Sequence, residues 1–261
     1  MSRKCFSVIL PARYGSTRCP GKPLAKIAGR PLIEWVYRRA SEIRGVSEIL
    51  VATDDERIAE AVRAFGARAV MTSSRHETGT DRVAEVARGL ESEYVVNLQG
   101  DEPVFDPELV ERMIGALDAA PEADIATACH PIASADEYGN PNVVKVVCDA
   151  TGCALYFSRA PIPHGWSAGA DGGHGARRHV GIYAYRRDAL LRFAALPRTP
   201  LERSERLEQL RALEHGMRIV VVETQKPTVG VDVPADVKAV EKVIFELYTG
   251  EIRPGSERKG P

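Results

Sequence analysis

Short apolar runs rich in β-branched residues alternate with segments of helical periodicity along the first half of the chain. The five runs are FSVIL, EILVAT, RAVMT, YVVNLQ and DIATAC. Parallel strands need a crossover of about a dozen residues or more, usually a helix, so this alternation predicts βαβ units and a mostly parallel sheet flanked by helices. A length of 261 residues allows one large α/β domain or a domain with an insertion.

Local end signals support the predicted helices. Asp54 or Asp55 can cap the second helix, and Gly66 is placed to end it. Asp106 precedes Pro107 at the start of a later helix, which pairs an N-cap carboxylate with a proline in the first turn. The helices are therefore expected at defined positions between the strands.

The pattern changes from Asn140 onward. Three strand-like runs follow one another there, NVVKVVCD, CALYFSR and HVGIYAY, and they predict an antiparallel insertion at 140–187. The glycine-rich segment 164–178 between the last two runs predicts a surface loop. We expect one structural domain, with an α/β part at 1–139, a return to the α/β core at 188–249 and a polar tail at 250–261.

Two further helices are predicted in the returning part of the chain. Thr199, Pro200 and Glu202 provide a cap, a first-turn proline and a capping-box carboxylate for a helix that continues to Gly216. RIVVVE is expected to be a strand, and the last helix is expected to open at Pro234.

Charge and composition exclude several classes of protein. Lys and Arg number 35 against 36 Asp and Glu, so the chain lacks the basic excess of a dedicated nucleic-acid or membrane-surface protein. No apolar run approaches the roughly 18 residues of a membrane span, and 6–10 is too short for a secretory signal. The five cysteines form no CxxC pair and are expected to be reduced packing residues, which favours a cytoplasmic location.

The loop PARYGSTRCPGKPL follows the first predicted strand and carries the strongest chemical signal. Arg13, Arg18 and Lys22 accompany Gly15 and Gly21 at a strand end, where open α/β sheets bind ligands. We therefore expect an anionic, phosphate-bearing ligand there, the alternative being a solvated basic loop. The loop contains no G-x-G-x-x-G. It is not a P-loop either, because five residues separate its glycines and a proline replaces the Ser or Thr that would hold magnesium.

The same loop resembles the signature of the cytidylyltransferases that activate 3-deoxy-D-manno-octulosonate (Kdo), the CMP-Kdo synthetases. The similarity continues in order through HETGTDR, NLQGDEP, NPNVVKVV, YFSRAPIP, HVGIYAYR, PLERSERLEQLR and GVDVPADV. It implies a nucleotidyltransferase-type, Rossmann-like fold and transfer of CMP from CTP to the anomeric hydroxyl of Kdo, with release of pyrophosphate. It also implies a homodimer and a place in lipopolysaccharide biosynthesis. Because the run NVVKVVCD is more apolar than one small sheet needs, we expect the insertion at 140–187, which is also expected to bind sugar, to form the dimer contact.

Two carboxylates fit the metal that such chemistry needs. Asp101 follows the strand YVVNLQ, and Asp232 lies in a turn before a predicted helix. Magnesium accepts carboxylate oxygens, usually one or two per site together with phosphate and water. By resemblance both aspartates are Mg²⁺ ligands, and with Arg13 and Lys22 they form the expected catalytic set. From spacing alone, Asp232 could be a plain N-cap and Asp101 a turn residue.

The nucleotide site implied by the resemblance draws on three motifs. HETGTDR begins another predicted helix, where hydroxyls and free N–H groups suit a pyrimidine or phosphates, although simple capping by Thr78 or Thr80 explains them equally well. A metalloprotease is excluded, because HETGT lacks the second histidine of H-E-x-x-H. The implied residues are Pro11, Ala12, Arg13, Gly15, Ser16, Lys22, Thr78, Gly79, Thr80, Arg82 and Gln99.

The sugar site must recognise one carboxylate and several hydroxyls. Arginine can grip a carboxylate with two hydrogen bonds, and histidine, tyrosine, glutamate and glutamine are ordinary hydroxyl partners. The positions that resemble the family's Kdo pocket are Gln99, Arg159, His179, Tyr183, Glu208 and Gln209. Without the resemblance, His179 would be read as a structural histidine, and Glu208 and Gln209 as solvated helix positions.

Three functions remain to be separated. CMP-Kdo synthesis is the main prediction, and a cytidylyltransferase for 8-amino-Kdo or a sialic acid is the nearest alternative. A non-catalytic nucleotide-binding regulatory module is the alternative from another class. That module would be expected to lack a metal carboxylate or a phosphate-loop cation, whereas Asp101, Asp232, Arg13 and Lys22 are all present.

Overall fold

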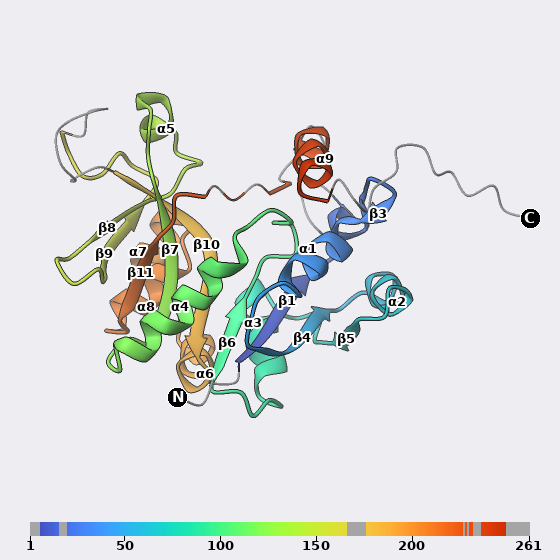
Figure 1. The fold of residues 1–261 in the computed structure, drawn as a ribbon. Coiled ribbons are helices and arrows are strands. Elements are labelled where there is room, and N and C mark those ends of the chain that lie inside the picture. The colour runs from blue at the N-terminus through green and yellow to red at the C-terminus, as the bar shows by residue number, and fades with distance from the viewer. Residues whose placement is uncertain are drawn as a thin grey trace, which may run out of the picture.

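A twisted sheet with helices on both faces forms the body of the molecule (Figure 1). The computed structural model describes residues 6–15, 20–165, 176–226, 228, 230–231 and 236–248. The strands of the main sheet are β1 (Phe6–Ala12), β4 (Val46–Thr53), β5 (Arg68–Met71), β6 (Tyr94–Asn97), β7 (Ile125–Pro131), β8 (Lys145–Cys148), β9 (Ala154–Ser158), β10 (Arg177–Arg186) and β11 (Ile219–Glu223). Two short strands, β2 (Lys26–Ile27) and β3 (Arg30–Pro31), pair separately.

The main path of the sheet has the order β11-β7-β10-β6-β1-β4-β5. Strand β1 is parallel to β4 and β6, β4 is parallel to β5, and β11 is parallel to β7. Only β10 runs against its neighbours on this path. The predicted mostly parallel, Rossmann-like sheet flanked by helices is therefore confirmed.

Helices cover the two faces of the sheet. They are α1 (Leu32–Ala40), α2 (Glu56–Ala64), α3 (Gly79–Ala87), α4 (Pro107–Ala119), α5 (Ala135–Gly139), α6 (Arg187–Ala195), α7 (Pro200–Glu205), α8 (Gln209–Glu214) and α9 (Asp236–Leu247), with a 3₁₀ turn η1 (Lys22–Leu24). Alternate residues of β1 enter different cores: Val8 and Leu10 pack with α1, α2 and α4, and Ile9 packs with α3, α6 and α8. Burial on both faces explains why the predicted strands are continuous apolar runs.

The predicted helix ends agree with the structure. Asp55 caps α2 by accepting a hydrogen bond from the backbone N–H of Arg57, and Gly66 follows the helix with a φ of +85°. Asp106 caps α4, whose first residue is Pro107. These boundaries follow from local chemistry alone, which is why the sequence locates them well.

The antiparallel region contains a hairpin and a strand, β10, that pairs both with the hairpin and with the main path of the sheet. β8 and β9 pair antiparallel, as predicted for the insertion. β10 begins beside β8, but its later residues lie between β7 and β6 in the main sheet. The third run of the predicted insertion is thus also a central strand of the α/β body.

The prediction of one continuous helix from Thr199 to Gly216 is wrong. The capping box of Thr199 and Glu202 and the first-turn proline are present, but α7 ends at Glu205 and Arg206 adopts a left-handed φ of 55°. Tertiary contacts interrupt the helix, because Arg159 donates from Nε to the carbonyl oxygen of Glu205 and from its backbone N–H to the Glu205 carboxylate. Only then does α8 begin.

The last helix lies far from the strand that precedes it in sequence. α9 packs near α1 and β3, on the opposite side of the picture from β11 (Figure 1). Its buried Val240 and Ile244 join Trp35 and Ile27 in a separate small core. The predicted start at Pro234, the centre of the loop 164–178 and the tail 250–261 lie outside the described residues. Among the described helices, none has both the length and the apolar character needed to cross a membrane.

Candidate active site

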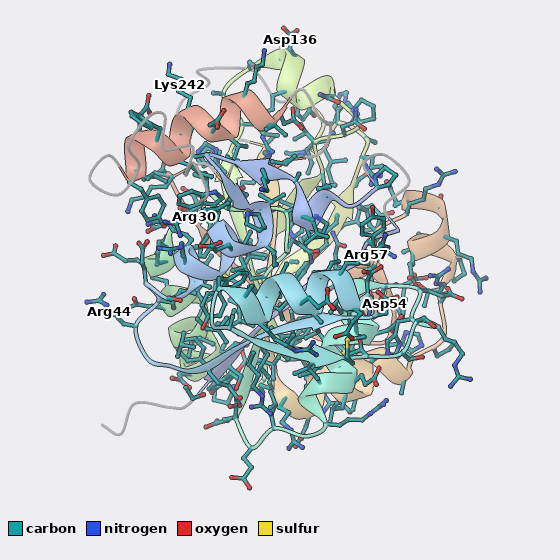
Figure 2. All side chains as sticks on the ribbon, turned by 90° about the vertical axis from the view of Figure 1, so that its right-hand side faces the viewer. Arg30, Arg44, Asp54, Arg57, Asp136 and Lys242 are labelled. Atoms are coloured by element: carbon teal, nitrogen blue, oxygen red, sulfur yellow. The ribbon has the colours of Figure 1, made fainter. Side chains whose placement is uncertain are left out.

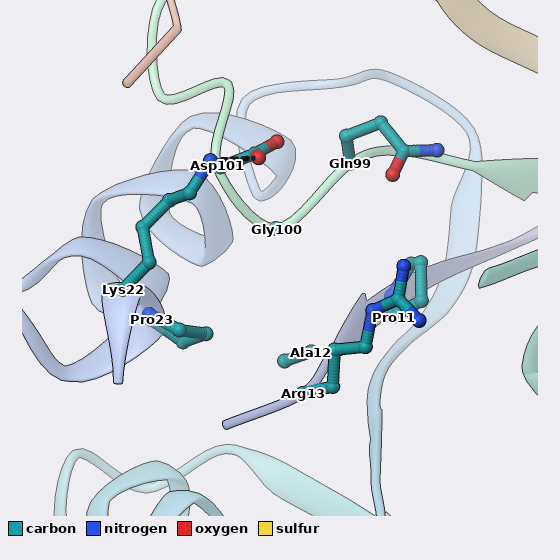
Figure 3. Close-up of a pocket in the computed structure, with 8 residues that line it drawn as sticks. All are labelled: Pro11, Ala12, Arg13, Lys22, Pro23, Gln99, Gly100 and Asp101. Atoms are coloured by element: carbon teal, nitrogen blue, oxygen red, sulfur yellow. Dashed lines mark hydrogen bonds and ion pairs between the residues drawn. The ribbon is translucent and has the colours of Figure 1, made fainter. Parts of the chain in front are cut away.

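A cavity of about 170 Å³ opens at the carboxyl ends of β1 and β6 (Figure 3). We call it the strand-end cavity, and its lining residues are Pro11, Ala12, Arg13, Lys22, Pro23, Gln99, Gly100 and Asp101. Six of them were predicted as site residues: Pro11, Ala12, Arg13, Lys22, Gln99 and Asp101. Two loops far apart in sequence therefore meet at the edge of the sheet where ligands of α/β folds bind.

Lys22 is the best-anchored charge in the strand-end cavity. Its Nζ donates to Oδ2 of Asp101 and to the backbone oxygen of Val231, both at 2.6 Å. Gly21 makes this position reachable, because its φ is +71° and an added Cβ would lie 3.0 Å from the ring of Tyr14. The loop thus turns tightly before η1, and a cation is held where the sequence predicted one.

Gly100 brings the two loops into contact. A Cβ at this position would lie 2.8 Å from the carbonyl oxygen of Pro11, closer than real Cβ atoms approach backbone. The glycine therefore permits the NLQGDE loop to lie directly on the end of β1. Gln99 and Asp101, on either side of it, are both turned toward the cavity as a result (Figure 3).

Asp101 is also bonded to the segment that leads into Asp232. Its backbone oxygen accepts from the N–H of Val231 at 2.9 Å, and a Cβ on Gly230 would lie 3.2 Å from the same oxygen. Asp232 itself lies outside the described residues. The residue before it is therefore fixed by both Lys22 and Asp101.

Among the remaining residues of the basic loop, some line the strand-end cavity and others do not. Arg13 lines the cavity and donates from Nη1 to the backbone oxygen of Glu77 at 3.2 Å. Gly15 is exposed and does not line the cavity, and Ser16 and Arg18 lie outside the described residues. Tyr14, next to Arg13, lies under the guanidinium of Arg57, whose Cζ is 3.4 Å from the ring centre. Arg57 comes from the first turn of α2, beside Asp54 (Figure 2).

The HETGTDR motif begins α3 as predicted. Thr78 caps the helix in a capping box with Asp81, and Gly79 lies beside Pro11 and Gln99. Arg82 is buried, does not line the cavity and forms an ion pair with Asp54 at 3.0 Å. The start of α3 therefore lies beside the cavity, whereas the buried Arg82 guanidinium forms an ion pair with Asp54.

Three predicted sugar residues line a second pocket. Tyr183, Glu208 and Gln209 surround it with Ile125, Tyr185 and Phe193, and we call it the aromatic pocket. His179 packs beside it, with its ring centre 5.4 Å from that of Tyr183 and its Nε2 2.9 Å from the hydroxyl of Thr127. The break between α7 and α8 brings Glu208 into this interior position.

Burial sets the protonation of the aromatic pocket. It lowers the pKa of His179 to about 3, so the imidazole is neutral at pH 7. It raises the pKa of the Tyr183 hydroxyl well above its ordinary value, and it raises that of Glu208 against the opposing effects of Thr80 and Arg211. This pocket therefore offers neutral rings and hydroxyls around one buried carboxyl group.

Arg159 does not join either cavity in this structure. Besides its two contacts with Glu205, it donates from Nη1 to the backbone oxygen of Pro141 at 3.0 Å. Its guanidinium therefore ties the end of β9 to α7 and to the start of the insertion. The predicted grip on a substrate carboxylate stays a prediction.

Two polar residues near the sites were not predicted from the sequence. Asn97 is 1% exposed at the end of β6, and Lys145 is fully buried in β8, where Nζ donates to three backbone oxygens, one of them that of Arg159. Both are single polar residues inside apolar strand runs. That interruption was a signal available in the sequence, because buried polar groups need partners.

Comparisons with known proteins point in one direction. The cytidylyltransferase family model matches residues 7–219. A 3-deoxy-manno-octulosonate cytidylyltransferase from Geobacter metallireducens is 51% identical over 247 residues, covering 91% of this chain and 97% of that protein. The protein of the same name from Halorhodospira halophila is 51% identical over 252 residues, covering 93% of this chain and 98% of that protein.

Solved structures agree with the sequence matches. A structure of CMP:2-keto-3-deoxy-manno-octonic acid synthetase complexed with CTP superposes with a TM-score of 0.86 at 45% identity, covering 94% of this chain and 99% of that one. A 4-diphosphocytidyl-2C-methyl-D-erythritol synthase from Anaerococcus prevotii superposes with a TM-score of 0.60 at 16% identity, covering 93% and 96% of the two chains. The second likeness concerns the fold alone.

Proposed function

The chain belongs to the cytidylyltransferase family, and from this premise we propose that it transfers CMP from CTP to the anomeric hydroxyl of 3-deoxy-manno-octulosonate, releasing pyrophosphate. The observation that carries the proposal is the strand-end cavity, where Lys22, Arg13 and Asp101 converge beside a glycine that lets two loops touch. Nucleotidyl transfer needs this combination of cations and carboxylate at a strand end rather than a covalent nucleophile.

The proposed reaction exchanges one bond at the α-phosphorus of CTP for another, and the residues of the strand-end cavity bind the phosphates. The anomeric oxygen forms a bond to the α-phosphorus of CTP, the bond from that phosphorus to the bridging oxygen of pyrophosphate breaks, and the hydroxyl proton passes to solvent water. Lys22 and Arg13 supply positive charge for the phosphates, and Lys22 is held in place by Asp101 and Val231. A cation positioned before the reaction stabilises developing charge without a reorganisation cost.

We propose Asp101 and Asp232 as the ligands of Mg²⁺. Supporting this is the carboxylate of Asp101 at the cavity and the attachment of Val231, the neighbour of Asp232, to Asp101 and Lys22. Carboxylate oxygens are the donors that magnesium prefers in proteins. When bound, the metal would neutralise phosphate charge and orient the phosphates.

The aromatic pocket is proposed as the sugar end of the site, and because its free volume is only about 10 Å³, we propose that the sugar lies at its mouth, against the partly exposed Tyr183 and Glu208. Tyr183, Glu208 and Gln209 line it, and neutral His179 packs against Tyr183. Hydroxyl, carboxyl and amide groups in a buried setting suit a substrate with many hydroxyls. Gln99 lines the strand-end cavity and is linked to Glu208 through Asn97 and Thr80, so we propose that a sugar held between Gln99 and Glu208 presents its anomeric oxygen toward the strand-end cavity.

Pyrophosphate release tests the proposal directly. The protein is mixed with each of the four nucleoside triphosphates and with Kdo, 8-amino-Kdo or a sialic acid, with and without Mg²⁺. We expect release with CTP and Kdo, and CMP-Kdo as the product by mass spectrometry. Release with CTP and only another acidic sugar would replace Kdo as the substrate, and binding of CTP with no release for any sugar would favour a regulatory module.

We also propose a homodimer formed through the antiparallel region. Strand β9 lies at an edge, paired with β8, and its Leu155 is 62% exposed. An exposed apolar side chain on an edge strand is typical of a contact surface. Sedimentation at micromolar concentration should give a dimer for the wild type and a monomer for Leu155→Asp, whereas a monomeric wild type would refute the dimer.

We place the enzyme in the cytoplasm, in the supply of activated sugar for lipopolysaccharide. The free thiols of Cys129, Cys148 and Cys153 agree with a reducing compartment. Cell fractionation with an antibody to the chain tests this location, and recovery with the membrane or periplasmic fraction would contradict it.

A further inference from the structure

A chain of hydrogen bonds joins the strand-end cavity to the aromatic pocket. Gln99 donates from Nε2 to Oδ1 of Asn97 at 3.4 Å, and Asn97 donates from Nδ2 to the hydroxyl of Thr80 at 3.3 Å. The Thr80 hydroxyl donates to Oε2 of Glu208 at 3.0 Å. The two middle residues are only 1% and 4% exposed, whereas each end residue lines one of the cavities.

The chemistry of its members fixes the direction of this chain. A carboxylate only accepts hydrogen bonds, so the single hydrogen of the Thr80 hydroxyl goes to Glu208. The Thr80 oxygen must then accept from Asn97, which turns the amide oxygen of Asn97 toward Gln99. Every donor along the chain therefore points from Gln99 toward Glu208.

This direction decides what the two ends offer to a ligand. With Nε2 of Gln99 engaged by Asn97, its amide oxygen lies on the cavity side, toward Pro11 (Figure 3). At the other end, Oε1 of Glu208 is buried and accepts no hydrogen bond from the described residues. Gln99 and Glu208 thus each present a hydrogen-bond acceptor. On a ligand rich in hydroxyl groups, the hydroxyls are the donors that can satisfy these acceptors.

We propose that Thr80 and Asn97 are positioning residues for the sugar, which act by holding the Gln99 amide and the Glu208 carboxylate as paired acceptors for two of its hydroxyl groups. This inference rests on the proposed function, because it takes the acceptor substrate to be a polyhydroxylated sugar acid. It assigns Thr80 a task different from direct contact with the nucleotide. The shared network also links the two cavities through groups that touch no substrate.

Thr80→Val tests the proposal, because valine keeps the shape and removes the hydroxyl. Initial rates are measured at pH 8 with the Kdo and CTP concentrations varied separately. We expect the KM for Kdo to rise about tenfold, the KM for CTP to stay within about twofold, and Thr80→Ser to return the KM for Kdo to within about twofold of wild type. Asn97→Leu should show the same selective rise.

Ser7→Ala is the matched control. Ser7 forms a buried hydroxyl bond to Ser92 at 2.6 Å near the amino end of β1, away from both cavities. Its loss should lower the melting temperature without changing either KM.

The outcomes separate the possible explanations. A rise in the KM for CTP alone, or no rescue by Thr80→Ser, would overturn the proposal, as would unchanged KM values in both Thr80→Val and Asn97→Leu. If one of these variants does not fold, circular dichroism will show it and the other variant decides. Should the wild type use a different acidic sugar, the assignment of Kdo fails, and the same comparison is made with that sugar.

Discussion

The two cavities solve opposite electrostatic problems. The strand-end cavity is charged, and its Lys22 forms an ion pair with the Asp101 carboxylate and donates to a backbone oxygen. The aromatic pocket is narrow, and burial there keeps His179 and Tyr183 neutral at pH 7 while it raises the pKa of the Glu208 carboxylate. A site for phosphates needs several permanent charges, whereas a site for hydroxyls works with neutral groups around one carboxylate acceptor, so one sheet edge can hold both only if they are kept apart.

This contrast predicts that variants of the strand-end cavity affect catalysis far more than stability. Asp101→Asn and Asp232→Asn should each lower kcat by about a thousandfold, because each removes a proposed magnesium ligand worth roughly 4 kcal/mol at the transition state. The double variant should be little worse than either single variant, since both serve one metal. Steady-state rates with magnesium titration check this, and losses that multiply would refute a shared ion.

Lys22→Ala should lower kcat/KM by about a hundredfold, or roughly 3 kcal/mol, because the lost cation faces the phosphates. Thermal unfolding should show a smaller loss of about 1–2 kcal/mol from the missing hydrogen bonds to Asp101 and Val231. Lys226→Ala is the control, since the exposed Lys226 pairs with the buried Asp106 outside the cavity. Near-normal kinetics in Lys22→Ala would show that the strand-end cavity does not depend on this cation for catalysis.

The aromatic pocket should instead make stability depend on pH. The pKa of His179 falls from 6.5 to about 3 on burial, so below pH 6.5 the unfolded chain binds a proton that the folded chain does not. The free energy of unfolding should therefore fall by about 2 kcal/mol between pH 6.5 and pH 5. Urea unfolding at several pH values should show that the free energy of unfolding depends less on pH in His179→Gln than in the wild type. An equal pH dependence in the two proteins would contradict a neutral His179 in the folded chain.

The smallest effect is expected at the support of the basic loop. Arg57→Ala removes the cation stacked on Tyr14, a contact worth about 0.5–1 kcal/mol at an exposed site. The KM for CTP should rise about two- to fivefold with little change in the KM for Kdo. Arg63→Ala, which removes an exposed ion pair from the same helix, should leave both constants unchanged. A larger effect on Kdo would show that the two cavities are not separate.

The sequence located the elements whose ends depend on local chemistry and the loop whose charges lie at a strand end. Asp55 and Asp106 cap the helices expected of them, and at the third helix Glu202 accepts from the backbone N–H of Thr199. The break at Arg206 was missed, because the contacts of Glu205 with Arg159 come from a distant part of the chain. Helix propensity depends on the local sequence and cannot predict a contact with a distant residue.

In the site, too, some features could be predicted from the sequence and others could not. Spacing and residue type placed Lys22 and Asp101 correctly at one edge, since strand order alone brings those loops together. The hydrogen bonds of Asn97 to Thr80 and Gln99 could not be read from spacing, because they depend on which buried polar groups face each other across the sheet. A lone asparagine in an apolar strand was the one available signal.

The position of α9 has a consequence for the timing of synthesis. Its Val240 and Ile244 pack with Val231, whose backbone oxygen accepts from Lys22, so the segment that follows the sheet in sequence holds a lysine of the strand-end cavity in place. A ribosome-bound nascent chain that has exposed only the segment up to Lys226 therefore contains the whole sheet but lacks Val231 and Asp232. We expect stalled chains of that length to release no pyrophosphate from CTP and Kdo, because they lack Asp232 and the helix that packs on Val231.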